Sequence, residues 1–488
     1  MCCVCKTTAD CEILGHVIIN TLPDEVLLLI FRFDRLLYLD EMRYFSRARG
    51  VFWKWHRLSQ VCRRWRSVVF GSPRFLGLGL VCRPRTPMGL VGIWPPFPII
   101  VTNYLATDRP MPEDYDFDAV IVHPNRISEI YLVFLTKLQL QRLAVALVRQ
   151  EQFAALVHLT VHFEDSRPGH LAPALPDGFL GGSTPCLQSL ELNSIPFPAL
   201  PKLLLSATDL VRLTLHRIPV SGYFSPEALV TALAVLANLT YFIIEFESPL
   251  SRPDRAIRRL PLPPTRIVLP ALTRFHFQGV SEYFEDVVAR MDAPLLDTVW
   301  ITFFHEPIFD VPQFARFMKR TPRLQALNKA HVDFDDSGVQ IGSLPLGRTV
   351  DDKSRLRILC RKVDKQLSSL AQVLTSFFPS IDVVEHLYIY RPRNLPSQWQ
   401  DNIENRQWLE IFRPFAAVRN LYICKEFAQC IAPVLQELVR EKALPALENL
   451  FLEELHPSRP VLSVQEAIGR FAAARRLSGH PVAVSDWR

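Results

Sequence analysis

A weakly repeated apolar pattern runs through most of this 488-residue chain and limits the folds that it can adopt. Residues 187–195 and 210–218 share apolar side chains at positions one, four, six and nine. Most copies start 23 to 34 residues apart, a period typical of repeat architectures. A chain of this length also exceeds one ordinary core. Looser copies start at Ile127, Leu156, Leu239, Leu272, Leu296, Val384, Val418 and Leu447.

The pattern predicts short strands, each followed by a helix that covers its apolar side. Positions four and six share one face of a strand, and stacking such units buries a continuous core. The template resembles a leucine-rich repeat, so we expect an α/β protein with an irregular, leucine-rich-repeat-like solenoid at residues 76–488. Ile195, Ile218 and Val280 stand where regular repeats commonly carry asparagine, which predicts the irregularity. The alternative is an ordinary α/β domain whose strands look alike.

Capping signals locate several of the covering helices. Ser225 before a proline predicts one helix start. Ser463 with Glu466 predicts a capping box for the last helix. Further helices are expected at residues 367–378 and 427–439. Three stretches are predicted to be long loops, where binding specificity tends to reside: residues 165–186, 248–270 and 333–352.

Near the N-terminus, residues 22–33 predict a helix that is apolar on nearly every side. Pro23 suits its first position, because the missing N–H would have no helical partner there. Asp24 follows in the first turn, where negative charge meets the positive end of the helix dipole. A small module cannot bury so much apolar surface alone, so we expect part of it to bind a partner. A second helix, ending at Gly71, is predicted to carry an apolar stripe made of Trp55, Leu58, Cys62, Trp65 and Val69.

The Leu22-Pro23 start and the Val61-Cys62-x-x-Trp65 finish together resemble an F-box. The resemblance covers residues 20–75 and implies docking onto the Skp-type adaptor of a cullin ubiquitin ligase. It also implies an adaptor-binding surface made of Leu22, Pro23, Leu27, Ile30, Phe31, Leu58, Val61, Cys62 and Trp65.

Residues 34–53 depart from the compact F-box pattern as a long insertion, which a surface connection tolerates thermodynamically. Residues 61–74 resemble members of large fungal F-box families. Residues 1–19 are expected to be a mobile tail. The alternative interpretation is an ordinary pair of helices that caps a larger domain.

Composition indicates a folded protein of a reducing compartment. The hydrophobic share is 49%, and no uninterrupted apolar run reaches the roughly 18 residues that a membrane helix needs. The N-terminus lacks the pattern of a secretory signal, and ten cysteines in so long a chain do not form a disulfide scaffold. We therefore expect a cytoplasmic or nuclear protein with no membrane partner. Cys2, Cys3, Cys5 and Cys11 leave acylation or metal binding of the tail as an alternative.

The net charge of +6 is concentrated near the F-box-like segment. Residues 42–107 contain no Asp or Glu. Such a basic stretch favours steering toward an acidic protein partner. The alternative, of equal weight, is an ordinary solvent-exposed helix face with no special partner. No nucleic-acid-binding motif accompanies it, so no nucleic-acid partner is expected. Its basic residues are Arg43, Arg47, Arg49, Lys54, Arg57, Arg63, Arg64, Arg66, Arg74, Arg83 and Arg85.

No catalytic constellation is visible, so we expect no enzymatic activity, no cofactor and no metal. His158 and His162 fall on one predicted strand and suit exposed positions better than metal ligation. Asp333 begins an acidic group that lacks the glycine and closing Glu of a calcium loop. The sequence therefore predicts the substrate-recognition subunit of a cullin-type, SCF-like ubiquitin ligase with an unknown protein substrate. Two alternatives stay open: a repeat-based interaction scaffold without ligase association, and an enzyme whose motif is not legible.

Overall fold

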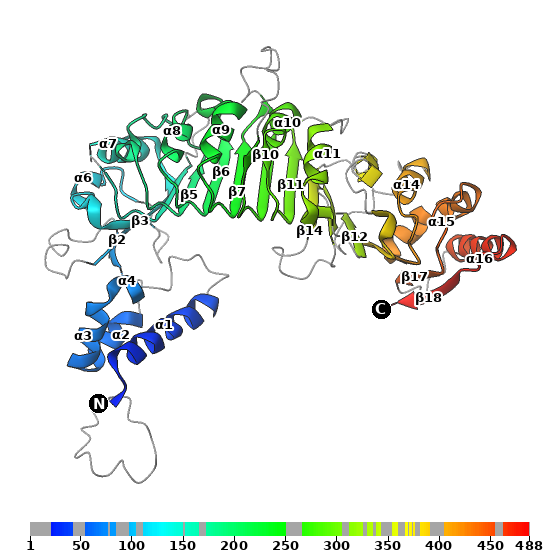
Figure 1. Ribbon diagram of the computed structural model, residues 1–488, viewed down its shortest axis with the longest axis horizontal. Helices are drawn as coiled ribbons and strands as arrows, with labels where there is room; N and C mark the ends of the chain where they lie inside the picture. Colours follow the sequence, from blue (N-terminus) through cyan, green and yellow to red (C-terminus); the bar gives the residue numbers. More distant parts are fainter. Residues whose placement is uncertain are drawn as a thin grey trace, which may run out of the picture. The chain divides into compact units, whose positions relative to one another are not determined.

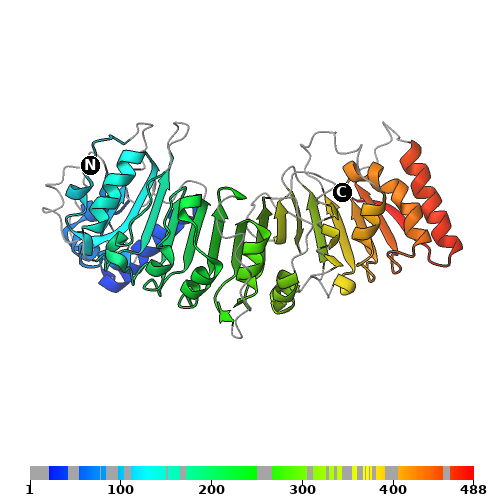
Figure 2. The same ribbon diagram turned by 90° about the horizontal axis from the view of Figure 1, so that it is seen from above.

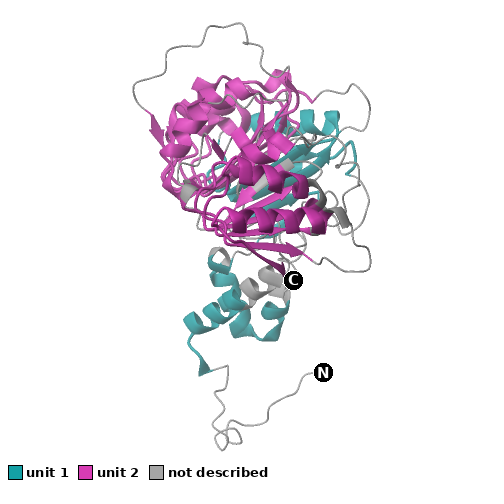
Figure 3. Cartoon of the chain, turned by 90° about the vertical axis from the view of Figure 1, so that its right-hand side faces the viewer, with its two compact units in different colours: residues 1–168 teal, residues 169–488 magenta. Residues whose placement is uncertain are grey.

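The computed structural model divides the chain into two compact units, residues 1–168 and 169–488 (Figure 3). This boundary differs from the expected division between residues 75 and 76. The expected tail at residues 1–19 and its cysteines lie outside the described residues. The structure describes residues 21–41, 54–76, 79–83, 97–103, 111–149, 152–164, 172–249, 266–304, 312–325, 329–334, 338–342, 354–359, 367–368, 370–372, 374–375, 381–390, 405–453 and 462–487.

Unit 1 begins with four helices: α1 (Asp24–Glu41), α2 (Lys54–Val61), α3 (Arg63–Gly71) and α4 (Pro73–Leu76). Two expectations are corrected here. The first helix continues to Glu41, well into the expected insertion, because residues 34–41 contain helix-forming leucines and neither Gly nor Pro. The expected second helix is two helices. Cys62 between them is extended and caps α3, with its Sγ accepting the Trp65 N–H at 3.4 Å.

The remainder of unit 1 is a parallel β-structure in which the strands follow chain order. Helix α7 (Lys137–Val148) leads from the third strand to the fourth, and Thr136 and Gln139 form a capping box at its start. The short helix α6 (Phe117–Val120) is capped by Asp116. The strands are β1 (Leu80–Cys82), β2 (Ile99–Thr102), β3 (Ile127–Leu135) and β4 (His158–Phe163).

Unit 2 contains a larger sheet whose neighbouring strands are parallel except where β13 pairs with β14 and with β12. Strands β5, β6, β7, β9 and β11 lie side by side in both ribbon views (Figures 1 and 2). In spatial order the strands are β5 (Ser189–Asn193), β6 (Arg212–Ile218), β7 (Tyr241–Phe246), β9 (Arg274–Gly279), β11 (Thr298–Phe303), β14 (Ser354–Leu359), β13 (Gly338–Gly342), β12 (Lys329–Phe334), β15 (His386–Tyr390), β16 (Asn420–Ile423), β17 (Asn449–Glu453) and β18 (Ala483–Trp487). A separate pair joins β8 (Ile267–Val268) to β10 (Met291–Asp292).

Each predicted copy of the apolar template contains a strand of the sheet. In the two best copies, positions four and six pair in register, Leu190 with Leu213 and Leu192 with Leu215. All four side chains are buried. Between β7 and β9 the corresponding rings of Phe242 and Phe275 stack at 5.2 Å. The template therefore locates the core side of the sheet correctly.

The helices of unit 2 pack on this core side. The Phe284 ring of α10 lies 5.9 Å from Phe275 of β9, and the Phe427 ring of α15 lies 5.3 Å from Phe334 of β12. Helices α8 to α11 form a row along the strands in Figure 1. The helices are α8 (Leu200–Leu204), α9 (Pro226–Leu233), α10 (Ser281–Val288), α11 (Pro312–Lys319), α12 (Pro322–Gln325), α14 (Asn405–Phe412), α15 (Lys425–Arg440) and α16 (Leu462–Leu477).

Three of the capping and loop predictions can be compared directly with these elements. Ser225 caps α9, accepting the Ala228 N–H at 3.2 Å, so that prediction is confirmed. The predicted last helix is present as α16, but it begins at Leu462, one residue before the predicted cap at Ser463, whose side chain lies outside the described residues. The loop predicted at residues 333–352 is wrong in part: it contains the end of β12 and all of β13. Val339 and Ile341 are buried there, and their alternation with Gln340 suits a strand with one core face.

Candidate functional site

The helices at the start of unit 1 enclose a small core of their own. Leu27 and Phe31 of α1 pack with Val68 and Val69 of α3, and all four are buried. Leu76 of α4 and Phe97, just before β2, complete the cluster. The Phe31 ring lies 4.7 Å from that of Trp65. The core positions α1 against α3, so it decides which side of the apolar first helix faces outward.

A charged contact ties the first turn of α1 to α3. The Arg64 guanidinium donates to Asp24 Oδ1 from Nε at 2.9 Å and from Nη2 at 2.7 Å. Nη2 also donates to the Leu22 carbonyl. Both side chains are partly exposed, so the ion pair adds little stability by itself. Its effect is to orient the Leu22-Pro23 turn relative to α3.

An exposed apolar stripe covers the outer side of α1. Its members are spaced i, i+3, i+4 and i+7, which places them on one helix face. Leu29 is 57% and Phe33 62% exposed, and Val61 at the end of α2 is 60% exposed. Single exposed apolar side chains are common on folded proteins, whereas a contiguous exposed group of them marks an interaction site. We call the set Val26, Leu29, Ile30 and Phe33 the α1 stripe.

The structure divides the nine residues predicted to bind an adaptor into three groups. Pro23, Ile30 and Val61 are exposed. Leu27 and Phe31 are buried, so in this conformation they hold the helices together and do not face a partner. The remaining four are partly buried, three of them at the edge of the core and one as the cap of α3: Leu22, Leu58, Trp65 and Cys62.

Sequence reasoning overlooked three exposed members of the α1 stripe, Val26, Leu29 and Phe33. The signal that could have found them is their helical spacing with Ile30. Because residues 26–31 are apolar without interruption, that spacing becomes informative only once the buried side of the helix is known.

Residues 19–74 match the F-box-like family. The match spans α1 to α3 together with their connections. No curated protein matches the chain. The chain therefore contains an F-box-like domain, and F-box domains generally bind Skp-type adaptors.

Some of the basic residues in the F-box-like domain have internal partners. Arg64 holds Asp24, and Arg66 Nε donates to the Ser59 carbonyl at 2.9 Å. Arg57 and Arg63 lie exposed on α2 and α3. Arg57 therefore lies on the same helix as Val61, and Arg63 lies at the start of the next helix, where both would add long-range attraction to an acidic partner.

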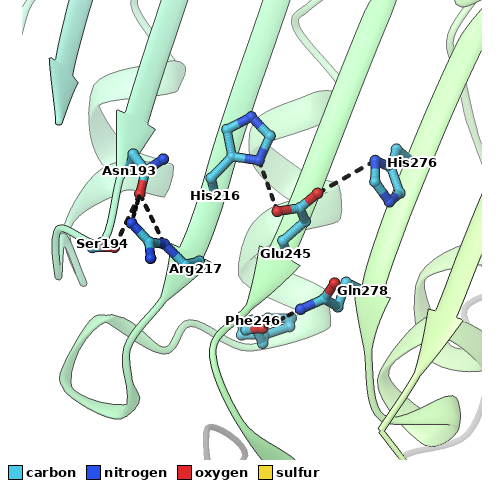
Figure 4. A network of polar contacts seen from close by, with 8 residues as sticks. All are labelled: Asn193, Ser194, His216, Arg217, Glu245, Phe246, His276 and Gln278. Atoms are coloured by element: carbon cyan, nitrogen blue, oxygen red, sulfur yellow. Dashed lines mark hydrogen bonds and ion pairs between the residues drawn. The ribbon is translucent and has the colours of Figure 1, made fainter. Parts of the chain in front are cut away.

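A second candidate surface lies on unit 2, on the side of the strands opposite the helices. We call it the open face. In Figure 4 its polar side chains stand in front of the strands and the helices lie behind. On β5, β6, β7, β9 and β11 it consists of Ser189, Glu191, Asn193, Arg212, Thr214, His216, Tyr241, Ile243, Glu245, Arg274, His276, Gln278, Thr298, Trp300 and Thr302.

A carboxylate between two imidazoles marks the middle of this part of the open face (Figure 4). Glu245 Oε2 lies 2.7 Å from His216 Nδ1, and Oε1 lies 3.4 Å from His276 Nδ1. Burial acts to lower the pKa of His216, but the hydrogen bond and charge of Glu245 outweigh it, and the pKa is raised. For Glu245, burial acts to raise the pKa, while His216 and then His276 lower it overall. The geometry favours an ion pair of His216 with Glu245.

Aromatic rings dominate the C-terminal part of the open face. They stack in register on adjacent strands: His331 on Tyr388 at 4.1 Å, Tyr388 on Tyr422 at 4.1 Å, and Tyr422 on Phe451 at 4.5 Å. The ring planes differ by 6°, 9° and 7°. We call these four residues the aromatic ladder. Burial, followed by the hydrogen bond and charge of Tyr422, raises the pKa of Tyr388 to about 12.

The described residues show neither a metal site nor a membrane-spanning helix. The described residues contain no group of three or more His, Cys, Asp or Glu side chains arranged to hold a metal ion. His158 and His162 are both partly buried on β4. Across the described ranges, each helix falls short of the length or apolar character needed to span a bilayer.

Proposed function

We propose that this protein is the substrate-recognition subunit of a cullin-type, SCF-like ubiquitin ligase. The F-box-like match at residues 19–74 carries the proposal. The α1 stripe and Val61 supply what such docking requires, a group of large apolar side chains that the domain itself leaves exposed. Arg57 and Arg63 add positive charge suited to an acidic adaptor.

In this proposal the buried and exposed residues of α1 have different tasks. Leu27 and Phe31 fix the helix on α3, while Ile30, Leu29 and Phe33 enter the adaptor surface. Large apolar anchors that become fully desolvated dominate the energy of most interfaces. The Arg64–Asp24 contact holds the Leu22-Pro23 turn in the position from which Pro23 can take part.

Unit 2 would then bind the target protein. Its strand–helix units recur along one sheet, which supports the interpretation as an irregular, leucine-rich-repeat-like solenoid. The open face offers a broad surface of partly exposed aromatic, charged and amide groups. Such surfaces on a rigid scaffold suit recognition of another protein.

The chemistry of ubiquitin transfer would be carried out by the other subunits. We propose that this chain contributes no acid, base or nucleophile and acts by proximity. Holding a target lysine near a charged conjugating enzyme raises the effective concentration of the reacting groups.

A pull-down with a purified Skp-type adaptor tests the proposal. The double variant Ile30→Ala with Phe33→Ala should lower adaptor affinity at least about tenfold, because both side chains are exposed anchors. Leu138→Ala is a control, since the exposure of Leu138 on α7 of the same unit lies between those of Ile30 and Phe33. Failure of the wild-type chain to bind would leave the protein as an interaction scaffold without a ligase. Unchanged binding of the double variant would show that the α1 stripe is not the docking surface.

A further inference from the structure

The aromatic ladder ends at Phe451. One face of its ring stacks on Tyr422, at 4.5 Å. On the other side, the in-register residue of β18 is Ser485, whose small side chain is exposed. A ring stack that ends beside a small exposed residue leaves room for one more planar group.

The charge at this end of the open face is negative. Strands β15 to β18 contain neither Lys nor Arg, and of their two acids Glu453 lies on this face, whereas Asp486 is in register with the core residue Leu452. Glu385, Arg419 and Glu448, directly before the strands, fall on the helix side by the same alternation, and Arg419 pairs with Glu448 there at 3.8 Å. The Glu453 carboxylate next to Phe451 therefore favours a cation over an anion or a neutral ring.

Glu453 lies on the same side of β17 as Phe451. Alternate residues of a strand share one face and are about 7 Å apart along it. A planar cation stacked on Phe451 could thus reach the Glu453 carboxylate through its edge. Guanidinium fits both demands, since it stacks on aromatic faces and donates to carboxylates from a rigid fork, whereas ammonium is a compact, strongly hydrated charge.

We propose that the Phe451 end of the aromatic ladder is a docking site for an arginine side chain of the target protein. The guanidinium extends the ring stack over Ser485 and hydrogen-bonds to Glu453. This assignment rests on the proposed role of unit 2 in target binding and names the chemistry that it recognises.

Saturation-transfer difference NMR on the full chain can test the site with N-acetylarginine methylamide as the probe. Ser485→Phe places a ring where the guanidinium would lie and should abolish the signal. Glu453→Gln should weaken binding about fivefold, the usual effect of losing a partly exposed charge partner. Glu448→Gln makes the same change in net charge on the helix side of the sheet, away from Phe451, and should leave binding unchanged.

The corresponding N-acetyl methylamides of lysine and phenylalanine identify which kind of side chain the site binds. The arginine probe should bind at least about threefold more tightly than the lysine probe. Equal binding of the arginine and lysine probes would indicate non-specific attraction of cations and overturn the proposal. An unchanged signal in Ser485→Phe would overturn it as well. A phenylalanine probe that binds best would identify an aromatic occupant and overturn it too. Adaptor binding by Ser485→Phe is measured in parallel, so that failure of the arginine site and failure of the F-box proposal are told apart.

Discussion

His331, the first ring of the aromatic ladder, should make unit 2 sensitive to acid. Its side chain is 3% exposed on β12. Burial, and then the nearby charge of Lys329, lower its pKa from the ordinary 6.5 to about 4. The unfolded chain therefore takes up a proton near pH 6.5, while the folded chain resists it until about pH 4. Stability should fall as the pH drops through this window and level off below it.

The size of the effect follows from the two pKa values. At pH 7 the histidine is neutral in both states and the penalty is small. At pH 5 the unfolded chain is favoured by about 2 kcal/mol, or about 30-fold in the opening equilibrium. His331→Phe removes the titrating group and keeps a ring that can stack on Tyr388 at the same place. The variant should therefore lose less stability than the wild type between pH 7 and pH 5, by about 2 kcal/mol.

Hydrogen exchange measures the local stability around β12 separately from that of the rest of the chain, which is useful because the chain has two units. Protection of peptides spanning β12 and β15 is compared between wild type and variant at each pH, with intrinsic exchange rates taken into account. His480→Gln, at an exposed histidine after α16, serves as control. If protection in His331→Phe falls with pH as steeply as in the wild type, the buried imidazole is not the cause and the reasoning is refuted.

Two further substitutions test other parts of the structure. Phe31→Ala should destabilise the F-box-like domain by about 3–5 kcal/mol, because Phe31 is buried in its core; circular dichroism and proteolysis of unit 1 would detect the loss, which an exposed Ile30→Ala change should not produce. Glu245→Gln should cost about 1–2 kcal/mol near pH 6, since it removes the charged partner of His216. The loss should shrink as the pH falls through the lowered pKa of Glu245, or rises through the raised pKa of His216. A pH-independent difference in Tm would contradict the ion pair.

The apolar template located the strands because its spacing reflects a local requirement, namely that alternate residues of a strand face the core. Leu213 and Leu215 must both turn to the core side of one short strand, and their spacing states this directly. The sequence of β13 does not contain this template. Its five residues begin and end with glycine, and its pairing with β12 and β14 depends on partners elsewhere in the sheet. Residues of this kind look like a loop until the tertiary structure supplies the neighbours.

The candidate docking site shows a related limit. The first helix is apolar on nearly all sides, so the sequence alone could not separate its core residues from its surface residues. The position of α3 makes the distinction, by burying Leu27 and Phe31 and leaving Leu29 and Phe33 outside. The motif residues could be named from the sequence, whereas which of them are buried and which are exposed depends on packing between the helices.

The apolar template could not predict the residues of the open face, and the reason is physical. The template consists of core positions, and the residues between them are free of the packing that makes a pattern legible. An in-register row of four rings at such free positions is therefore more than the core requires. Each stacked pair is worth about 0.5–1.5 kcal/mol, so the row also makes this part of the sheet rigid. A rigid aromatic surface binds a partner at low entropic cost, which is the property that target recognition by unit 2 would need.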